Sequence, residues 1–393
     1  LYRPEIDGLR AIAVVAVIIF HAKLSFQGFN ILPGGFFGVD IFFVISGFLI
    51  TSIIINELEL KGSFSFLNFY ERRSRRILPV LMIVSLTSFI VGYAIIQSQH
   101  LILFSQSSIS SILFISNIYF YISGIAYDAE TSLLIPLLHT WSLSVEEQFY
   151  IMYPLFFIFF SRLIKGKILF LLIFISLLSL ILAQFGSVFF SISNFYLLPT
   201  RIWEIFCGAM LVLIVKKDNN HKFFKDIISY IGLILILLSF HFFKDATLHP
   251  SFITLIPILG TMLVIRYSDN NFISKFLSQN FLVFIGLISY SLYLWHYPIF
   301  SFSEILGNDS SNINKIILIL ISLVLSIISY YLIEKKFRNK VLISNNLFAF
   351  CLIISILIIS IFTFIVHKEK GHPNRAHLIF NEDFTEKPWE LLK

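Results

Sequence analysis

The chain has 393 residues, of which 57% are hydrophobic and only 13% are charged. Soluble globular domains carry about 25% charged residues, so this composition excludes an ordinary soluble protein. The net charge of +6 is explained by Lys and Arg residues that face the cytoplasm in membrane proteins, so we expect no nucleic-acid partner. The two cysteines, Cys207 and Cys351, lie inside apolar runs and indicate neither a disulfide framework nor a thiolate metal site.

Long apolar runs predict an all-α polytopic membrane protein with about eleven transmembrane helices. Each run is close to the roughly 20 residues that cross the hydrocarbon core. The runs are continuous and do not alternate with period two, which argues against a barrel. No cleavable signal pattern is evident, so the first run is predicted to be the first span. The predicted spans are residues 10–30, 36–56, 77–97, 139–161, 168–189, 197–215, 226–243, 251–266, 280–300, 313–333 and 344–366.

The segment 101–121 is apolar but interrupted by polar residues, and it is either a further crossing or a re-entrant or interfacial helix. The basic residues favour the second interpretation. If this segment does not cross and the N-terminus is cytoplasmic, most of the 29 Lys and Arg residues face the cytoplasm. The outer loops then carry only Lys23, Lys244 and Lys315. We therefore predict a cytoplasmic N-terminus and a C-terminus outside.

Arg10 and His21 are the first ionisable pair that a bilayer should exclude unless they have a function. They lie eleven positions apart, which is three helical turns plus about 20°, so they share one face about 16 Å apart. An imidazole at depth suits proton transfer near neutral pH. In the alternative interpretation Arg10 is a snorkelling anchor and His21 a packed polar residue between helices.

Arg73 and Arg76 belong to a basic run that precedes the third predicted span. Being three residues apart, they point to one helix face, where two guanidinium groups can bind phosphates in bidentate fashion. The alternative is a topology anchor that contacts anionic lipids.

A third polar group opens the fourth predicted span, where His139, Ser142 and Glu146 follow one another at helical spacing and Glu147 is adjacent. A hydrolase triad is disfavoured, because residues stacked on one helix rarely reach the required geometry. We predict instead that they line a cavity that opens outward, and that Asp40, near the outer end of the second span, pairs with them.

Three further intramembrane groups have simpler interpretations. Arg201 and Glu204 are three residues apart and are predicted to pair with each other. His296, between Trp295 and Tyr297, is predicted to be an interfacial aromatic anchor.

No Walker motif, dinucleotide fingerprint or zinc-ligand spacing is present, so we predict no metal and no permanently bound cofactor.

Four blocks of this sequence resemble the acyltransferase-3 family, in order along the chain from residue 1 to about 340. The blocks are residues 3–11, 34–51, 139–150 and 288–296. In that family an Arg and a His with ten residues between them in the first helix are essential, and they match Arg10 and His21. A cytoplasmic Arg-x-x-Arg matches Arg73 and Arg76. The block around Glu146 matches as well.

The resemblance is strongest to the O-antigen and peptidoglycan O-acetyltransferases that carry an eleventh helix and an exported SGNH-hydrolase-like domain. It implies an acyltransferase domain over residues 1–343, an additional helix at 344–366 and an outward linker at 367–393. The sequence ends at Lys393 without an SGNH domain. Either it is truncated, or a separate SGNH-type partner completes the transfer.

The expected protein is thus a multi-pass O-acyltransferase of the bacterial inner membrane. The resemblance implies acetyl-CoA or another acyl-CoA as co-substrate and a cell-envelope glycan, such as lipopolysaccharide O-antigen, as acceptor. His21 is expected to act as general base or as acyl nucleophile. Rival functions are a transporter or flippase of a glycan or lipid-linked intermediate, and a scaffold for an exported enzyme.

Overall fold

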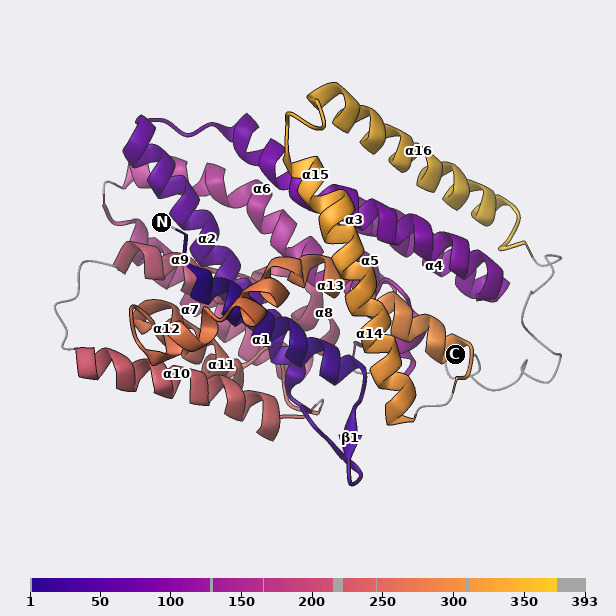
Figure 1. The fold of residues 1–393 in the computed structure, drawn as a ribbon. Helices are drawn as coiled ribbons and strands as arrows, with labels where there is room; N and C mark the ends of the chain where they lie inside the picture. Colours follow the sequence, from indigo (N-terminus) through magenta and orange to yellow (C-terminus); the bar gives the residue numbers. More distant parts are fainter. Residues whose placement is uncertain are drawn as a thin grey trace. The chain divides into compact units, whose positions relative to one another are not determined.

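A computed structural model of the chain describes residues 2–127, 130–164, 166–214, 222–244, 246–308 and 311–372. Most of these residues are helical, and the described strands form a single two-stranded hairpin (Figure 1). The chain forms two compact units. The first unit comprises Leu1–Phe66 and Val145–Ser289, and the second comprises Leu67–Ser144 and Tyr290–Lys393. Helices α6 (Thr140–Leu163) and α13 (Asn280–Ile305) pass from one unit into the other.

The first unit is a helical bundle in which α2 packs on α9, α7 packs on α9, and α10 packs on α11. Helix α1 packs on α2, η1 and α12. The elements of this unit are α1 (Pro4–His21), β1 (Ser25–Phe26), β2 (Phe29–Asn30), η1 (Gly35–Phe37), α2 (Gly38–Lys61), α7 (Ile168–Phe189), α8 (Ser191–Tyr196), α9 (Leu198–Ile214), α10 (Lys222–Phe242), η3 (Phe252–Thr254), α11 (Leu255–Tyr267) and α12 (Phe272–Leu277).

Glycines allow α2 and α9 to approach backbone to backbone. Gly47 faces the carbonyl oxygen of Ile205, and Gly208 faces that of Val44, with no room for a Cβ at either position. Small residues at such contacts are typical of helix pairs in membranes, where dispersion between closely packed backbones replaces the hydrophobic effect. This contact fixes α2, which carries Asp40, against α9, which carries Arg201.

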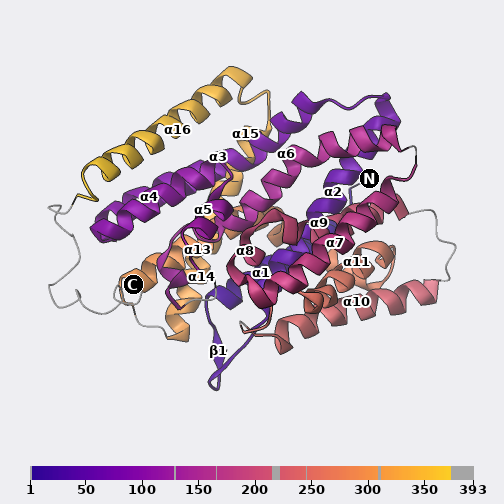
Figure 2. The ribbon, with the colours of Figure 1, turned by 180° about the vertical axis from the view of Figure 1, so that it is seen from behind.

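The second unit contains α3 (Phe66–Ile95), α4 (Ser98–Ile112), α5 (Ser116–Ile122), η2 (Glu130–Leu134), α14 (Asn312–Ser329), the π-helical turn η4 (Tyr330–Glu334), α15 (Lys335–Arg338) and α16 (Asn345–Lys368). Helix α16 runs alongside α4 (Figures 1 and 2). The core that these two helices share with α3 includes Phe89, Phe104 and Ile359.

Among the described residues, eight helical segments are long and apolar enough to cross a membrane. They are Gly35–Lys61, Phe66–Ile95, Ile168–Phe189, Ser191–Ile214, Phe223–Phe242, Asn280–Ile305, Asn312–Arg338 and Asn345–Lys368. The three other predicted spans correspond to α1, α6 and the α11 segment. Helix α1 carries Glu5, Asp7 and Arg10, and α11 has only 13 residues. The all-α multi-pass fold is confirmed, whereas eleven crossings and their orientation stay predictions.

The predicted boundaries of the first span are wrong at both ends. Helix α1 begins at Pro4 and ends at His21, and residues 25–30 form a hairpin. Its two turn residues, Gln27 and Gly28, have φ values of 50° and 84°, the left-handed backbone of a tight hairpin turn. The apolar residues after His21 therefore pair as strands and do not extend the helix.

Two other segments also differ from their predicted limits. Helix α3 begins at Phe66, so the basic run is helical and precedes the apolar part without a break. The segment 101–121 contains two short helices, α4 and α5, separated at Phe114, whose φ is 56°. Helix α4 has 15 residues, which is shorter than a full crossing requires.

Candidate active site

Arg10 and His21 lie on the same helix, α1, and both side chains are buried in the first unit. Arg10 is 8% exposed and His21 is 7% exposed. Arg10 donates to Asp7 Oδ1 at 3.0 Å and to Ser289 Oγ at 2.8 Å. Tyr2 in turn donates to the other oxygen of Asp7 at 2.7 Å. A snorkelling arginine would extend toward water, so these contacts argue against the anchor interpretation of Arg10.

Glycines allow the first turns of α1 to pack closely against α12 and α13. Gly8 meets the backbone of Leu277, and Gly286 meets the backbone carbonyl of Asp7, again without room for a Cβ. The backbone that carries Asp7 and Arg10 is therefore fixed on two sides. Ser289 lies one helical turn beyond Gly286, which brings its hydroxyl to the guanidinium.

His21 is the last residue of α1, and its ring lies 5.3 Å from that of Phe20. The following turn, η1, packs on the same part of α1. Gly35 meets the carbonyl of Ala16 and Gly38 meets that of Ala13. The GGFFG segment, residues 34–38, thus covers the end of α1 that carries His21.

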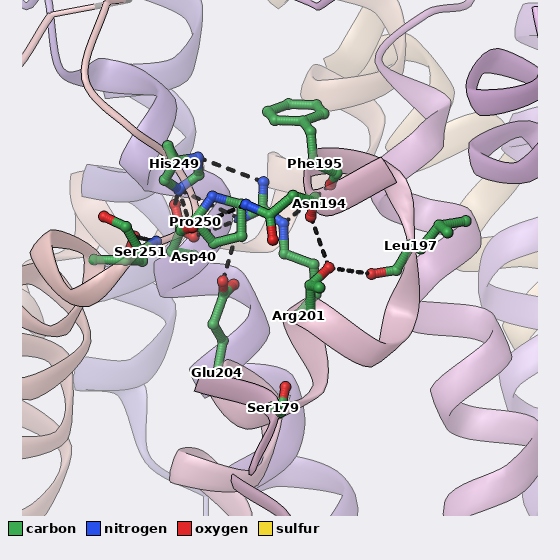
Figure 3. A network of polar contacts seen from close by, with 12 residues as sticks. Asp40, Ser179, Asn194, Phe195, Leu197, Arg201, Glu204, His249, Pro250 and Ser251 are labelled. Carbon is green, nitrogen blue, oxygen red and sulfur yellow. Dashed lines mark hydrogen bonds and ion pairs between the residues drawn. The ribbon is translucent and has the colours of Figure 1, made fainter. Parts of the chain in front are cut away.

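A fully buried charged cluster lies close to this segment in the first unit (Figure 3). Arg201 Nη1 lies 3.0 Å from Asp40 Oδ1 and 3.2 Å from Glu204 Oε1. His249 Nε2 lies 3.0 Å from Asp40 Oδ1 and 3.3 Å from Arg201 Nη1. The side chains of Asp40, Arg201 and Glu204 are all 0% exposed.

This cluster changes two predictions. The pair of Arg201 and Glu204 is confirmed, but Arg201 is also bound to Asp40. Asp40 was predicted to pair with the polar residues that open the fourth span; that pairing is wrong, because Asp40 is fully enclosed and its partners are Arg201 and His249. Its place in an acceptor-side lining stays a prediction. An isolated carboxylate at this depth would be prohibitively costly, so it is paired.

His249 was missed by the sequence analysis. It lies in the loop between α10 and η3, where no periodicity marks it as buried. Burial, and the positive charge of Arg201 beside it, hold the pKa of His249 well below its usual value. A neutral imidazole can donate one N–H and accept at the other nitrogen, which suits a position between a carboxylate and a guanidinium.

Glu146 lies in the first unit and is half-buried. Ser46 Oγ donates to Glu146 Oε1 at 3.2 Å, and the Tyr150 hydroxyl donates to Oε2 at 3.2 Å. The neighbouring Glu147 is 7% exposed. Glu146 is thus a partly accessible carboxylate held by hydroxyl groups, able to accept a hydrogen bond from a bound hydroxyl.

His139 and Ser142 lie in the second unit and do not form a nucleophile–base pair. Ser142 Oγ is 2.7 Å from the Tyr293 hydroxyl, which donates to the backbone oxygen of His139 at 2.9 Å. The His139 ring stacks on Tyr297, and its nitrogens form no hydrogen bond of ordinary geometry with the described residues. The disfavoured triad is therefore not formed.

His296 belongs to the same aromatic group as His139 in the second unit. Its ring lies 5.6 Å from that of His139, and its side chain is 0% exposed. An interfacial anchor needs contact with the headgroup region, so the predicted anchor role of His296 is wrong.

The basic run on α3 contains a buried residue that the sequence analysis did not single out. Arg75 is 1% exposed and donates to Glu71 Oε1, to the carbonyls of Phe337 and Ile343, and to Asn345 Oδ1. Its guanidinium also lies over the Phe348 ring at 4.7 Å. All its polar atoms are thus engaged within the second unit.

Arg73 and Arg76 differ from Arg75, because both are only partly buried. The Arg73 guanidinium lies 5.9 Å from the centre of the Phe69 ring. Arg76 forms no hydrogen bond or ion pair within the described part of the chain. Their spacing of three residues on α3 places both on one side of the helix.

Glu334 is a buried carboxylate that the sequence analysis did not single out. It ends the π-helical turn, is 1% exposed, and receives hydrogen bonds from Ser291 at 3.1 Å and Arg338 at 3.4 Å. The signal was available, since an acidic residue directly follows an apolar run and precedes Lys335. π-Helical turns often occur at functional sites.

The predicted site residues are divided between the two units. Arg10, His21, Asp40, Glu146 and Glu147 belong to the first, whereas Arg73, Arg76, His139 and Ser142 belong to the second. Within the described ranges, no three or more His, Cys, Asp or Glu side chains are grouped closely enough to hold a metal ion.

Comparison with known proteins identifies the family. The family model described as an acyltransferase domain matches residues 3–365. A protein of Staphylococcus aureus strain MSSA476, provisionally named an O-acetyltransferase, is 34% identical over 360 residues, covering 86% of this chain and 58% of the relative. The O-acetyltransferase OatA of S. aureus strain NCTC 8325 / PS 47 is 33% identical over 361 residues, with the same coverage.

The chain therefore spans somewhat more than half the length of these curated relatives. No solved structure matches it. The family match covers nearly all of the described helices, from the first turn of α1 to the last turn of α16. The chain belongs to the acyltransferase-3 family of membrane proteins.

Proposed function

We propose that this protein is a membrane O-acyltransferase that moves an acetyl group from acetyl-CoA to a hydroxyl of a cell-envelope glycan. The observation that carries the proposal is the buried pair on α1, in which Arg10 is fixed by Asp7 and Ser289 and His21 ends the same helix. The relatives named O-acetyltransferases support the acetyl group and the oxygen acceptor.

The donor is proposed to bind from the cytoplasmic side, with its phosphates on Arg73 and Arg76. Arg75 is enclosed and fully engaged, so it holds α3 in place and is not available to a ligand. The neighbouring Arg73 and Arg76 are partly exposed and can form charge-assisted hydrogen bonds with phosphate oxygens. Arg10 is proposed to guide the thioester end toward His21.

In the chemical step the acceptor oxygen attacks the thioester carbonyl carbon, and a C–O bond forms as the C–S bond breaks. His21, acting as general base, takes the hydroxyl proton and returns it to the leaving thiolate, which gives CoA-SH. In the second possible route His21 first takes the acetyl group on its ring nitrogen and then passes it to the hydroxyl. Both routes need His21.

The acceptor is proposed to approach from the outer side, where Glu146 can orient a sugar hydroxyl. Glu146 is half-buried and held by Ser46 and Tyr150, so it has a defined position and some access. Glu147, His139 and Ser142 remain proposed lining residues. Lipopolysaccharide O-antigen is one acceptor of the required chemistry, and an SGNH-type partner is proposed to complete transfer outside the bacterial inner membrane.

The test uses the purified chain in nanodiscs and measures hydrolysis or exchange of acetyl-CoA. Wild type is compared with His21→Ala and Arg73→Ala. His241→Ala and Arg72→Ala serve as matched controls, because both control side chains are exposed. We expect His21→Ala to abolish turnover, Arg73→Ala to raise KM for acetyl-CoA, and both controls to behave as wild type.

The opposite outcome separates the rival functions. A folded wild-type protein that neither binds nor turns over acetyl-CoA would contradict the proposed donor. Vesicles that move a labelled lipid-linked glycan would then favour a flippase. Turnover that persists in His21→Ala would refute the role of His21 while leaving the acyltransferase activity in place.

A further inference from the structure

The segment that covers the His21 end of α1 is held on three sides within the first unit. On one side, Gly35 and Gly38 touch the backbone carbonyls of α1. On a second side, the Gly34 N–H donates to the backbone oxygen of Phe240 at 2.9 Å. The third side is formed by His249, which comes from a loop more than 200 residues away in the sequence.

The His249 ring lies between this segment and the charged cluster. It meets Phe36 edge-on at 5.1 Å and Phe37 edge-on at 5.0 Å. Its Nε2 lies 3.0 and 3.1 Å from the two oxygens of Asp40. Arg201 binds the same carboxylate, so the position of the ring is set by a buried ion pair. Edge-to-face ring contacts are directional, and a fixed His249 therefore fixes the two phenyl rings.

Ring contacts through Phe36 connect His249 to the proposed catalytic residue His21. Phe36 packs edge-on against Phe20 at 5.4 Å, and Phe20 lies 5.3 Å from the His21 ring. Two aromatic side chains therefore separate His249 from His21. Because protein interiors are closely packed, a displaced Phe36 must displace its neighbours.

We infer that His249 is a positioning residue for the acyl-transfer reaction: its ring, held by Asp40 and Arg201, keeps Phe36 and Phe20 in place and thereby sets the orientation of the His21 imidazole. The inference rests on the proposed role of His21. The buried cluster of Asp40, Arg201 and His249 then has a role beyond charge pairing, namely to position His21.

Two substitutions separate the two properties of His249. His249→Gln keeps an N–H that can donate to Asp40 but removes the ring. His249→Phe keeps the ring between Phe36 and Phe37 but removes the bond to Asp40. His241→Gln is the matched control, because His241 lies on α10 of the same unit with an exposed side chain.

Each variant is assayed for kcat and for KM of acetyl-CoA, beside wild type and His21→Ala. We expect both His249 variants to lower kcat by roughly 10- to 100-fold, the effect of a misplaced catalytic group. KM should stay within about twofold, because donor binding is not affected by this change. A variant that folds poorly has a smaller active fraction. The kcat of each variant is therefore normalised to its own folded fraction.

A second readout does not depend on activity. The protein is labelled with ¹⁵N-histidine, and the His21 resonances are assigned by their loss in His21→Gln. We expect them to shift in His249→Gln and to stay in place in His241→Gln. Wild-type kcat and an unmoved His21 resonance in both His249 variants would overturn the inference. If wild type shows no turnover, the proposed function fails, and the resonance shift alone decides whether His249 positions His21.

Discussion

At the scale of single residues, the buried arginines of the first unit differ in their exposure and in the groups that they bind. Arg10 binds the carboxylate of Asp7 and the hydroxyl of Ser289. Arg201 has two carboxylates, an imidazole and the backbone oxygen of Phe195. Arg201 is fully enclosed, whereas Arg10 keeps 8% of its surface exposed, so Arg10 is the better candidate for contact with substrate and Arg201 for structural support.

Ser289 tests how much the position of Arg10 matters. Ser289→Ala removes the hydroxyl that holds Nη2, and we expect kcat/KM to fall roughly 10- to 100-fold. That loss corresponds to about 1.5–3 kcal/mol for a hydrogen bond to a charged group. Steady-state kinetics with acetyl-CoA measure it. Ser289→Thr keeps the hydroxyl and should recover most of the activity. Wild-type kcat/KM in the alanine variant would show that the Ser289 hydroxyl is not needed to position Arg10.

At the scale of elements, α3 shows that one run of arginines serves two purposes. Arg75 faces inward and binds groups from residues 337–345, while Arg73 and Arg76 remain partly exposed. Lys340 adds an ion pair to Glu71 of the same helix. The start of α16 is thus attached to α3 through Arg75, and the helix that carries the proposed phosphate ligands is held in a fixed place.

Arg75→Ala should therefore act on stability, and Arg73→Ala on donor binding. Removing one partner of a buried charged network typically costs about 3–5 kcal/mol, so we expect a clearly lower melting temperature for Arg75→Ala. Arg73→Ala should melt as wild type does. Thermal unfolding in detergent, followed by intrinsic fluorescence, checks both. Equal melting temperatures for wild type and Arg75→Ala would refute this division of roles.

The same helices show which features the sequence could predict. Apolar length located α2, α7 and α16 within a few residues, because burial in lipid demands long continuous runs. Arg10 and His21 lie on one helix, as their spacing predicts, and Arg201 pairs with Glu204. Spacing cannot reveal partners from distant segments. Arg75 meets Phe337 across 262 positions, and Asp40 meets His249 across 209, so both contacts exist only after folding.

At the scale of the whole molecule, the orientation in the membrane determines from which side the proposed donor and acceptor reach His21. Eight of the described helical segments are apolar enough to cross by composition. Helices α1 and α6 carry buried or half-buried ionisable groups, which is what an acyl-transfer site inside a bilayer requires. If, as proposed, acetyl-CoA binds from the cytoplasm and the glycan from outside, His21 must be accessible from both sides of the membrane.

Four cysteine positions test this topology in a background without Cys207 and Cys351. Gln27→Cys lies in the hairpin and Asn308→Cys follows α13; we predict that both face outward. Ser63→Cys follows α2 and Val341→Cys follows α15; we predict that both face the cytoplasm. All four native side chains are exposed, so each cysteine can react. An impermeant maleimide added to intact cells should label the first two and spare the last two.

Each alternative topology gives its own pattern. Labels at 63 and 341 in place of 27 and 308 would mean that the whole chain is inverted against the distribution of its basic residues. Labels at 27 and 341 would mean that the segment 101–121 crosses fully, because every later loop would then change sides. In that case residues 63–76 stay cytoplasmic while the loop after α15 moves outside. Arg75 could not then bind the carbonyls of Phe337 and Ile343, so the close contacts between α3 and residues 337–345 independently favour the predicted topology.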